Sequence, residues 1–235
     1  MAGTLTAGLL LLADSRLPSG GHGHSGGVEA LVERGLIATT ADLEVFLDGR
    51  LRTSGTVPAA AAAAACGLAA HPDREPEPDW ASWDEAVSAR TPSAALRAAS
   101  RAQGAALLRT VTLAWPGPAV EALRALGGVH HPLVLGVAAA AAGGTPLDAA
   151  GLALHHMIGG ACTAAVRLLG LDPLAVAAVA ARAGRRAEAV ARTAGDAAAA
   201  AVADADPALL PGESSPLHDV LAQLHDSSEA TLFAS

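Results

Sequence analysis

Residues 132–170 read PLVLGVAAAAAGGTPLDAAGLALHHMIGGACTAAVRLLG, and this stretch decides the fold. Its first part, residues 132–142, is apolar on every side, which predicts a helix buried in the core. Thr145 and Pro146 follow as a helix start, because a threonine cap and an early proline both suit the first turn. The helix after them is the longest apolar one, and we expect it to end at Gly170.

The same signals of helix start and stop recur on both sides of this stretch. They predict helices at residues 4–13, 25–35, 40–52, 58–70, 79–89, 91–109, 119–126, 132–142, 145–170, 172–204 and 216–233. The start at 91 rests on the pair Thr91 and Pro92. No alternating run bounded by turns predicts a strand. We therefore expect an all-α fold, in which residues 1–235 form a single-domain bundle of roughly ten helices with no sheet.

Two segments between the predicted helices are expected to be mobile loops. Residues 71–78 hold three prolines and four charges, and residues 204–215 are polar with two prolines. Proline and charged residues in such clusters are typical of surface connections.

The composition limits both the core and the partners of the chain. Hydrophobic residues make up 51% of the 235 residues but aromatic residues only 2%, so most of the apolar content is alanine. Alanine buries little area, so such a core needs close helix packing and gains from a partner surface. The net charge of -8 disfavours nucleic acid as a partner.

The sequence favours a cytoplasmic protein without a membrane span. The N-terminus lacks the positive segment and cleavage pattern of a signal peptide. Cys66 and Cys162 form no metal-type pair, which fits a reduced compartment. The apolar stretch 147–171 contains His155, His156 and Arg167, which would be costly in lipid.

A loop rich in glycine and histidine, LPSGGHGHSGG at residues 17–27, interrupts the N-terminal helices. His22 and His24 could bind a divalent metal such as nickel or zinc, and two copies in a homodimer would supply four ligands. The alternative interpretation is a polar loop with two exposed histidines. The paired histidines elsewhere, at 130–131, 155–156, 218 and 225, are more typical of capping or packing.

The sequence holds no recognisable catalytic constellation, which argues against an enzyme. A phosphate loop, a His-Glu-x-x-His motif and a Cys-x-x-Cys motif are all missing. Arg167 follows apolar residues in a helix, so it either lies at an interface or extends past an alanine face to solvent. Gly151, Gly159 and Gly160 in the same helix would let a neighbouring backbone approach closely.

Five segments in order resemble the urease accessory protein UreF family. The matching pieces are a Leu-Pro-x-Gly-Gly loop with the helix after it, a central helix, a His-x-Pro segment, an Ala-Ala-x-Arg-Leu stretch and a C-terminal pattern. They lie at residues 17–21 with 25–29, 93–104, 131–136, 164–168, and 216–219 with 232–235. The family loop usually carries aromatic residues where His22 and His24 stand here.

The resemblance implies an all-helical, cytoplasmic homodimer that catalyses no reaction of its own. Such proteins bridge a UreD partner, also called UreH, and the UreG GTPase during nickel delivery to apo-urease. Nickel is then handled by the complex and GTP is bound by UreG, with no cofactor held tightly by this chain. Residues 216–235 are the expected docking tail, and partner contacts are expected at Pro18, Gly20, Gly21, Arg97, Arg101, Arg167, His218, Asp219, Leu232 and Phe233. The alternative is a standalone metal-storage or metal-sensing protein that uses His22 and His24.

Overall fold

The computed structural model describes residues 6–18 and 24–226, and within them it is built from helices alone. This confirms the predicted all-α fold. The helices are α1 (Ala7–Ala13), α2 (Val28–Glu33), α3 (Thr40–Arg52), α4 (Thr56–Ala69), α5 (Trp80–Ala89), α6 (Ala94–Ala114), α7 (Pro118–Leu126), α8 (His131–Ala141), α9 (Pro146–Leu169), α10 (Pro173–Ala203), the short 3-10 helix η2 (Pro207–Leu209) and α11 (Pro216–Asp226).

Helix boundaries follow local capping chemistry. Thr145 and Asp148 form a capping box at the start of α9, in which each side chain satisfies a backbone N–H of the other residue. Gly170 ends α9 in the left-handed conformation, with φ of 63°. The predicted start of α6 at Thr91 and Pro92 was wrong, because Thr91 Oγ1 donates back to the Val87 carbonyl of α5 and Ser93 caps α6 instead.

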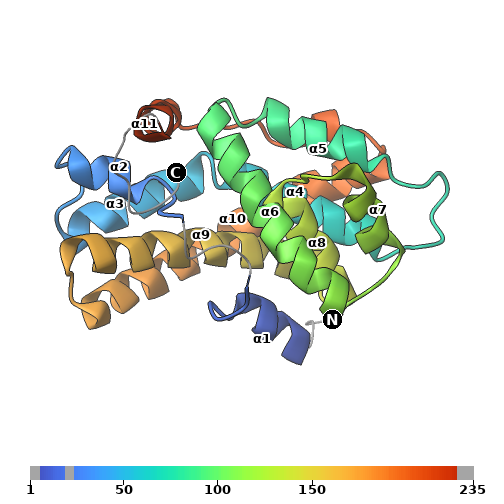
Figure 1. Cartoon of the computed structure of the whole chain (residues 1–235), viewed down its shortest axis with the longest axis horizontal. Coiled ribbons are helices and arrows are strands. Elements are labelled where there is room, and N and C mark those ends of the chain that lie inside the picture. The colour runs from blue at the N-terminus through green and yellow to red at the C-terminus, as the bar shows by residue number, and fades with distance from the viewer. Residues whose placement is uncertain (1–5, 19–23, 227–235) are drawn as a thin grey trace.

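The core is centred on α4 and α8, two helices buried on all sides (Figure 1). Helix α4 packs against α8, α9 and α10, and its residues 59–66 are all buried. A Cβ at Gly136 of α8 would overlap the carbonyl oxygen of Ala62 on α4. The two backbones therefore approach as closely as glycine and alanine allow, and this closeness compensates for the small side chains.

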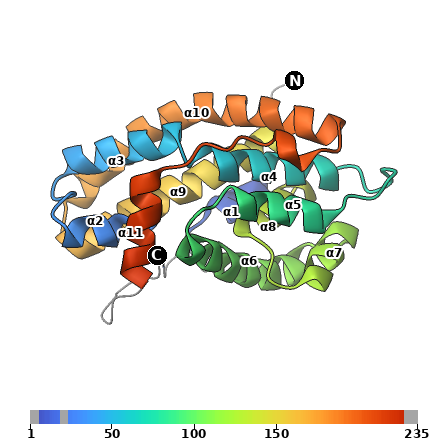
Figure 2. The same cartoon turned by 90° about the horizontal axis from the view of Figure 1, so that it is seen from above.

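Helices α5, α6 and α7 lie beside α4 and α8, whereas α2, α3 and α11 lie toward the other end of α9 and α10 (Figures 1 and 2). Helices α9 and α10 pack along each other, and α3 lies on α10. Helix α6 packs on α8 from the opposite side, and α11 lies against both α2 and α6. Helix α11 thus connects two parts of the molecule that are formed by distant segments of the chain.

An ion-pair network fastens α3 to α10. Glu44 accepts hydrogen bonds from Arg182 at 2.7–3.1 Å and from Arg186 at 3.2 Å, and Arg186 also lies 3.3 Å from Asp48. The Arg182 hydrogen bond holds the pKa of Glu44 well below its usual value, at about 2.

Within residues 6–18 and 24–226, one helix is long and apolar enough to cross a membrane by length and composition alone. This helix is α9, and 56% of its most apolar window is buried inside the molecule. Because α9 packs against α4, α8 and α10, its hydrophobicity is accounted for as that of a core helix.

The segment between α10 and α11, which the sequence predicts to be mobile, is attached to α5 by one arginine. Arg90 donates to the carbonyl oxygens of Ala208, Leu210 and Pro211 at 2.7–3.0 Å. Leu210 itself is buried. The polar segment 71–78 connects α4 to α5, and Arg74 within it donates to the Val202 carbonyl of α10.

The packing of α8 on α4 predicts opposite effects for one substitution at two helical glycines. Gly136→Ala should destabilise the fold by about 1–3 kcal/mol, because the new methyl group overlaps the α4 backbone. Gly195→Ala on α10 is the matched control, since a Cβ there meets nothing within 4 Å. It should stabilise the fold by about 0.5–1 kcal/mol through the unfolded state. Urea unfolding of both variants tests this, and equal effects of one sign would contradict it.

Candidate partner-docking site

The loop after α1 begins the candidate site. Leu17 is buried, whereas the next residue, Pro18, is exposed and its carbonyl oxygen accepts a hydrogen bond from Thr110 of α6 at 3.0 Å. This contact fixes the start of the loop on α6. Gly20, Gly21 and His22, which the sequence analysis singled out, lie outside the described residues.

The loop ends in a glycine turn that depends on having no side chains. Gly26 and Gly27 adopt φ of 60° and 89°, in the left-handed region that favours glycine. A Cβ at Gly27 would overlap the imidazole of His218, which comes from α11 at the far end of the sequence. The absence of a side chain at Gly27 therefore leaves the space that His218 of α11 occupies, and this explains the glycine directly before α2.

Arg50 joins this turn to α11. Its Nη1 atom donates to the Gly26 carbonyl oxygen at 2.6 Å and lies 3.0 Å from His218 Nε2. His218 Nε2 also lies 3.0 Å from the same Gly26 carbonyl oxygen, so Arg50, Gly26 and His218 form one compact polar contact. The guanidinium also lies 5.8 Å from the centre of the Phe46 ring, within range of a cation–π contact.

Burial sets the protonation states at this junction. Burial first, and the Arg50 charge second, lower the pKa of His218 to about 3, so the imidazole is neutral at neutral pH. Burial also lowers the pKa of Arg50 to about 10, which leaves it charged. The pKa of Asp219, the next residue of α11, is raised by burial.

A second contact holds the other end of α11. His225 is 1% exposed and its Nε2 atom lies 3.1 Å from a carboxylate oxygen of Glu29 on α2, itself 4% exposed. Its Nδ1 atom lies 3.6 Å from Glu33. Leu221 and Ala222 are buried between the two histidines. The inner face of α11 is therefore held by polar contacts at both ends.

The outer face of α11 is also apolar, although the outer face of a surface helix is usually polar. Leu217, Val220 and Leu224 are 61%, 57% and 50% exposed, and their spacing places them on one side of the helix. We call these three residues the α11 stripe. A helix that buries histidines and exposes leucines indicates that another surface covers it.

Two arginines predicted to contact a partner are engaged within the chain. Arg97 donates to the carbonyl oxygens of Thr91 and Pro92 at 2.7 and 2.8 Å, which closes the connection between α5 and α6. Arg101 pairs with Asp84 of α5 at 2.8 Å. Any partner contact by either residue would therefore compete with these bonds.

The Arg101 pair belongs to a buried network that the sequence analysis missed. His130 is fully buried, and its two ring nitrogens lie 3.0 Å from the hydroxyls of Ser88 and Ser100. Its backbone N–H donates to Asp84. Burial lowers the pKa of His130 to about 4. No spacing along the sequence could have linked these residues, because they come from three elements.

The adjacent histidines of α9 form hydrogen bonds with carbonyl groups at the C-terminal end of α1. His156 Nε2 lies 2.8 Å from the Leu12 carbonyl and His155 Nε2 lies 3.2 Å from that of Ala13. Both rings thus act as donors to carbonyls that the end of a helix leaves unpaired. His24 and His131 line the same cavity as this pair. Within residues 6–18 and 24–226, no group of three or more His, Cys, Asp or Glu side chains is placed to hold a metal ion.

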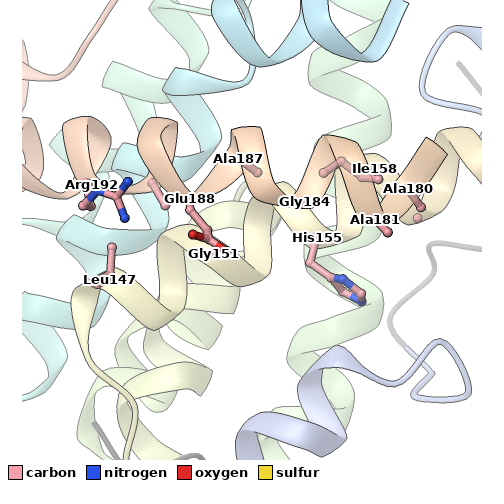
Figure 3. Close-up of a pocket in the computed structure, with 12 residues that line it drawn as sticks. Leu147, Gly151, His155, Ile158, Ala180, Ala181, Gly184, Ala187, Glu188 and Arg192 are labelled. Carbon is pink, nitrogen blue, oxygen red and sulfur yellow. The ribbon is translucent and has the colours of Figure 1, made fainter. Parts of the chain in front are cut away.

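An apolar groove of about 660 Å³ runs between α9 and α10 (Figure 3). Leu147, Gly151 and Ile158 line it from α9, and Gly184 and Ala187 line it from α10. A Cβ at Gly151 or Gly184 would meet nothing within 4 Å. The sequence suggested that Gly151, Gly159 and Gly160 let a neighbouring backbone approach closely. In the described part of the chain, a Cβ at any of these glycines would meet nothing within 4 Å. Arg167, farther along α9, is exposed.

Four histidines with lowered pKa values predict acid sensitivity. Burial lowers the pKa of His218 and of His131 to about 3 and that of His130 to about 4, and it also lowers the pKa of His156, in each case from the ordinary value of 6.5. Between pH 6.5 and 4 the unfolded chain therefore binds more protons, so stability is greatest above pH 6.5 and falls with decreasing pH. The slope should be about 1.4 kcal/mol per pH unit for each histidine.

Urea unfolding at a series of pH values tests this expectation. His218→Gln should remove one of these four contributions to the slope. Gln103→Ala, at a cavity-lining residue without a titratable group, is the control and should leave the slope unchanged. A stability that stays constant from pH 7 to pH 4.5 would contradict the assignment of neutral imidazoles.

Comparison with known proteins places the chain among the urease accessory proteins. A family model described as UreF matches residues 37–184. A urease accessory protein UreF of Mycolicibacterium vanbaalenii is 44% identical, with 97% of this chain and 98% of the relative covered. The UreF proteins of a Mycobacterium species and of Mycobacterium marinum are 44% and 41% identical over 99% of this chain and 99% and 100% of their own lengths. By these matches, the chain belongs to the UreF family of urease accessory proteins.

Proposed function

We propose that this protein is an adaptor that bridges a UreD (UreH) partner and the UreG GTPase during nickel insertion into apo-urease. Membership of the UreF family supports a role in urease maturation. The observation that carries the adaptor role is the α11 stripe, because an exposed apolar face on a helix with a polar inner face is suited to binding another protein.

We assign the α11 stripe and the adjoining loop to UreD. The carbonyl of Pro18 is hydrogen-bonded to Thr110 of α6, and α11 also packs on α6. The loop and α11, the two predicted contact regions, therefore lie against the same helix. Asp219 is half-buried on α11, next to the stripe. Leu232 and Phe233, the expected contacts in the tail, lie outside the described residues, and we propose that they extend the same surface.

The groove between α9 and α10 is the proposed interface of a homodimer. Glycine in a helix costs about 0.5–1 kcal/mol relative to alanine. Among the described residues, no neighbouring atom gives a steric reason for glycine at Gly151, Gly159 or Gly184, which line this groove. Glu188 and Arg192 of α10 lie in the same groove (Figure 3). In a two-fold pair, Glu188 of each copy can face Arg192 of the other.

Nickel is the cargo of the proposed complex, and this chain holds no cofactor tightly. We propose that GTP is bound and hydrolysed by UreG. His22 and His24 stay candidates for a transient metal contact in a dimer. The protein is proposed to act in the cytoplasm and to bind neither nucleic acid nor membrane.

The UreD assignment predicts that polar substitutions in the α11 stripe break the complex. Replacing Leu217, Val220 and Leu224 together by Ser should abolish co-purification with UreD and urease activation in co-expressing cells. These side chains are exposed, so folding should be little affected. Leu113→Ser is the control, since Leu113 of α6 is 87% exposed and lies outside the stripe.

Hydrogen exchange provides the independent measurement for the same surface. Residues 216–235 should gain protection when UreD is added to the wild-type chain. Unchanged protection there, or an intact complex with the triple Ser variant, would rule out α11 as the docking helix.

The dimer assignment predicts a difference between two glycines of one helix. Gly184→Leu fills the groove and should weaken self-association at least tenfold, whereas Gly195→Leu, outside the groove, should not. Glu188→Arg should weaken the dimer and Glu188→Arg with Arg192→Glu should restore it. Sedimentation velocity measures each variant, and equal association of the two Leu variants would exclude this interface.

A further inference from the structure

The groove between α9 and α10 is too small to hold two copies of the chain together by itself. Twelve residues line it (Figure 3). A stable interface buries about 800 Å² of each partner and uses about 20–30 residues on each side. A second copy seated in the groove must therefore also contact an element beside it.

Helix α1 adjoins the groove at His155. This residue lines the groove from α9, and its Nε2 atom lies 3.2 Å from the Ala13 carbonyl oxygen at the end of α1. In Figure 3 the imidazole points from α9 toward the N-terminal part of the chain. His155 and Gly159 also line the inner cavity to which Ala13 contributes. A protein seated in the groove would therefore lie next to α1.

The inner face of α1 is fixed on the rest of the chain. Leu9 and Leu12 are buried. A Cβ at Gly8 would lie only 2.8 Å from the Cβ of Ala142 on α8, so the two helices are in close contact there. Thr6 Oγ1 donates to the Ala142 carbonyl oxygen at 2.7 Å. These contacts hold α1 in one orientation, so it presents a defined outer face.

The outer face of α1 is apolar. The seven residues of the helix, AGLLLLA, include no polar or charged side chain. Leu10 and Leu11 are 56% and 44% exposed. Burial of apolar area is the main favourable contribution to protein association, and the core of an interface is poor in charged groups. The outer face of α1 therefore has the composition of an interface core.

We propose that Leu10 and Leu11 of α1 contact a second copy of the chain and complete the self-association surface that begins in the α9–α10 groove. The proposal rests on the homodimer interface assigned to that groove. Two observations favour a second copy as the occupant. The groove alone offers too few residues for a stable dimer, and α1 is attached to α9 through His155, which itself lines the groove.

Sedimentation velocity of the full chain tests this contact. Replacing Leu10 and Leu11 together by Ser should raise the dissociation constant of the dimer at least tenfold. Leu126→Ser is the matched control, because Leu126 is 41% exposed and lies on α7, which packs against α5, α6 and α8. The control should change the dissociation constant less than twofold. Circular dichroism ensures that only variants with the helix content of the wild type are compared.

A second measurement uses the wild-type sequence and so does not depend on how the variants fold. A mixed dimer is prepared from one methyl-labelled copy and one unlabelled copy. Isotope-filtered NOE spectra should show contacts from the Leu10 and Leu11 methyl groups to protons of the unlabelled copy. The Leu126 methyl groups should show none. Dilution below the dissociation constant should remove the contacts of Leu10 and Leu11.

The outcomes separate this contact from the groove interface. Weaker association of the double Ser variant, together with the intermolecular NOEs, supports the α1 contact. An unchanged dissociation constant or absent NOEs, in a dimer that Gly184→Leu does weaken, overturns the α1 contact alone. If neither Gly184→Leu nor the double Ser variant weakens the dimer, both proposals fail. Loss of UreD co-purification with intact self-association would instead assign Leu10 and Leu11 to UreD and overturn the α1 contact.

Discussion

The structure depends on the close approach of α4 and α8. Helix α4 is mostly alanine along its buried length, and Gly136 of α8 lies directly against the backbone of Ala62. Each alanine buries little apolar area, so the contact is stabilised by many short-range dispersion contacts between tightly packed atoms. Helices α9 and α10 add to the same centre, and α6 packs on α8 from outside it. A wider spacing of α4 and α8 would displace all of these helices together.

The shortage of large apolar residues also explains where polar groups are found. Helix α11 is attached by His218 and His225 at its ends, with Leu221 and Ala222 between them, and so retains leucines for its outer face. The His130 network performs the same function between α5, α6 and the start of α8. Directional hydrogen bonds specify these positions where volume alone would not, and burial keeps the imidazoles of His218 and His130 neutral at neutral pH.

Local signals were sufficient to predict the helices. The bounds of α3 agree with the prediction, and the caps Thr145 and Asp172 were identified from sequence because capping is a contact between near neighbours. The candidate site could not be predicted in the same way, since His218 contacts Gly26 across 192 positions of the chain. One signal was available for Arg50: it lies seven residues after Leu43 and three after Leu47, which places it on the buried side of α3. The partners of such a residue depend on packing between distant segments.

The attachment of Arg90 to residues 208–211 also limits how far α11 can travel. Only residues 212–215 separate that anchor from the helix, and four extended residues span at most about 14 Å. A detached α11 would therefore remain at a high effective concentration near the surface of α2 and α6 on which it packs. Exchange of α11 between two copies of the chain would first require the Arg90 bonds to break, so this short tether acts against domain swapping.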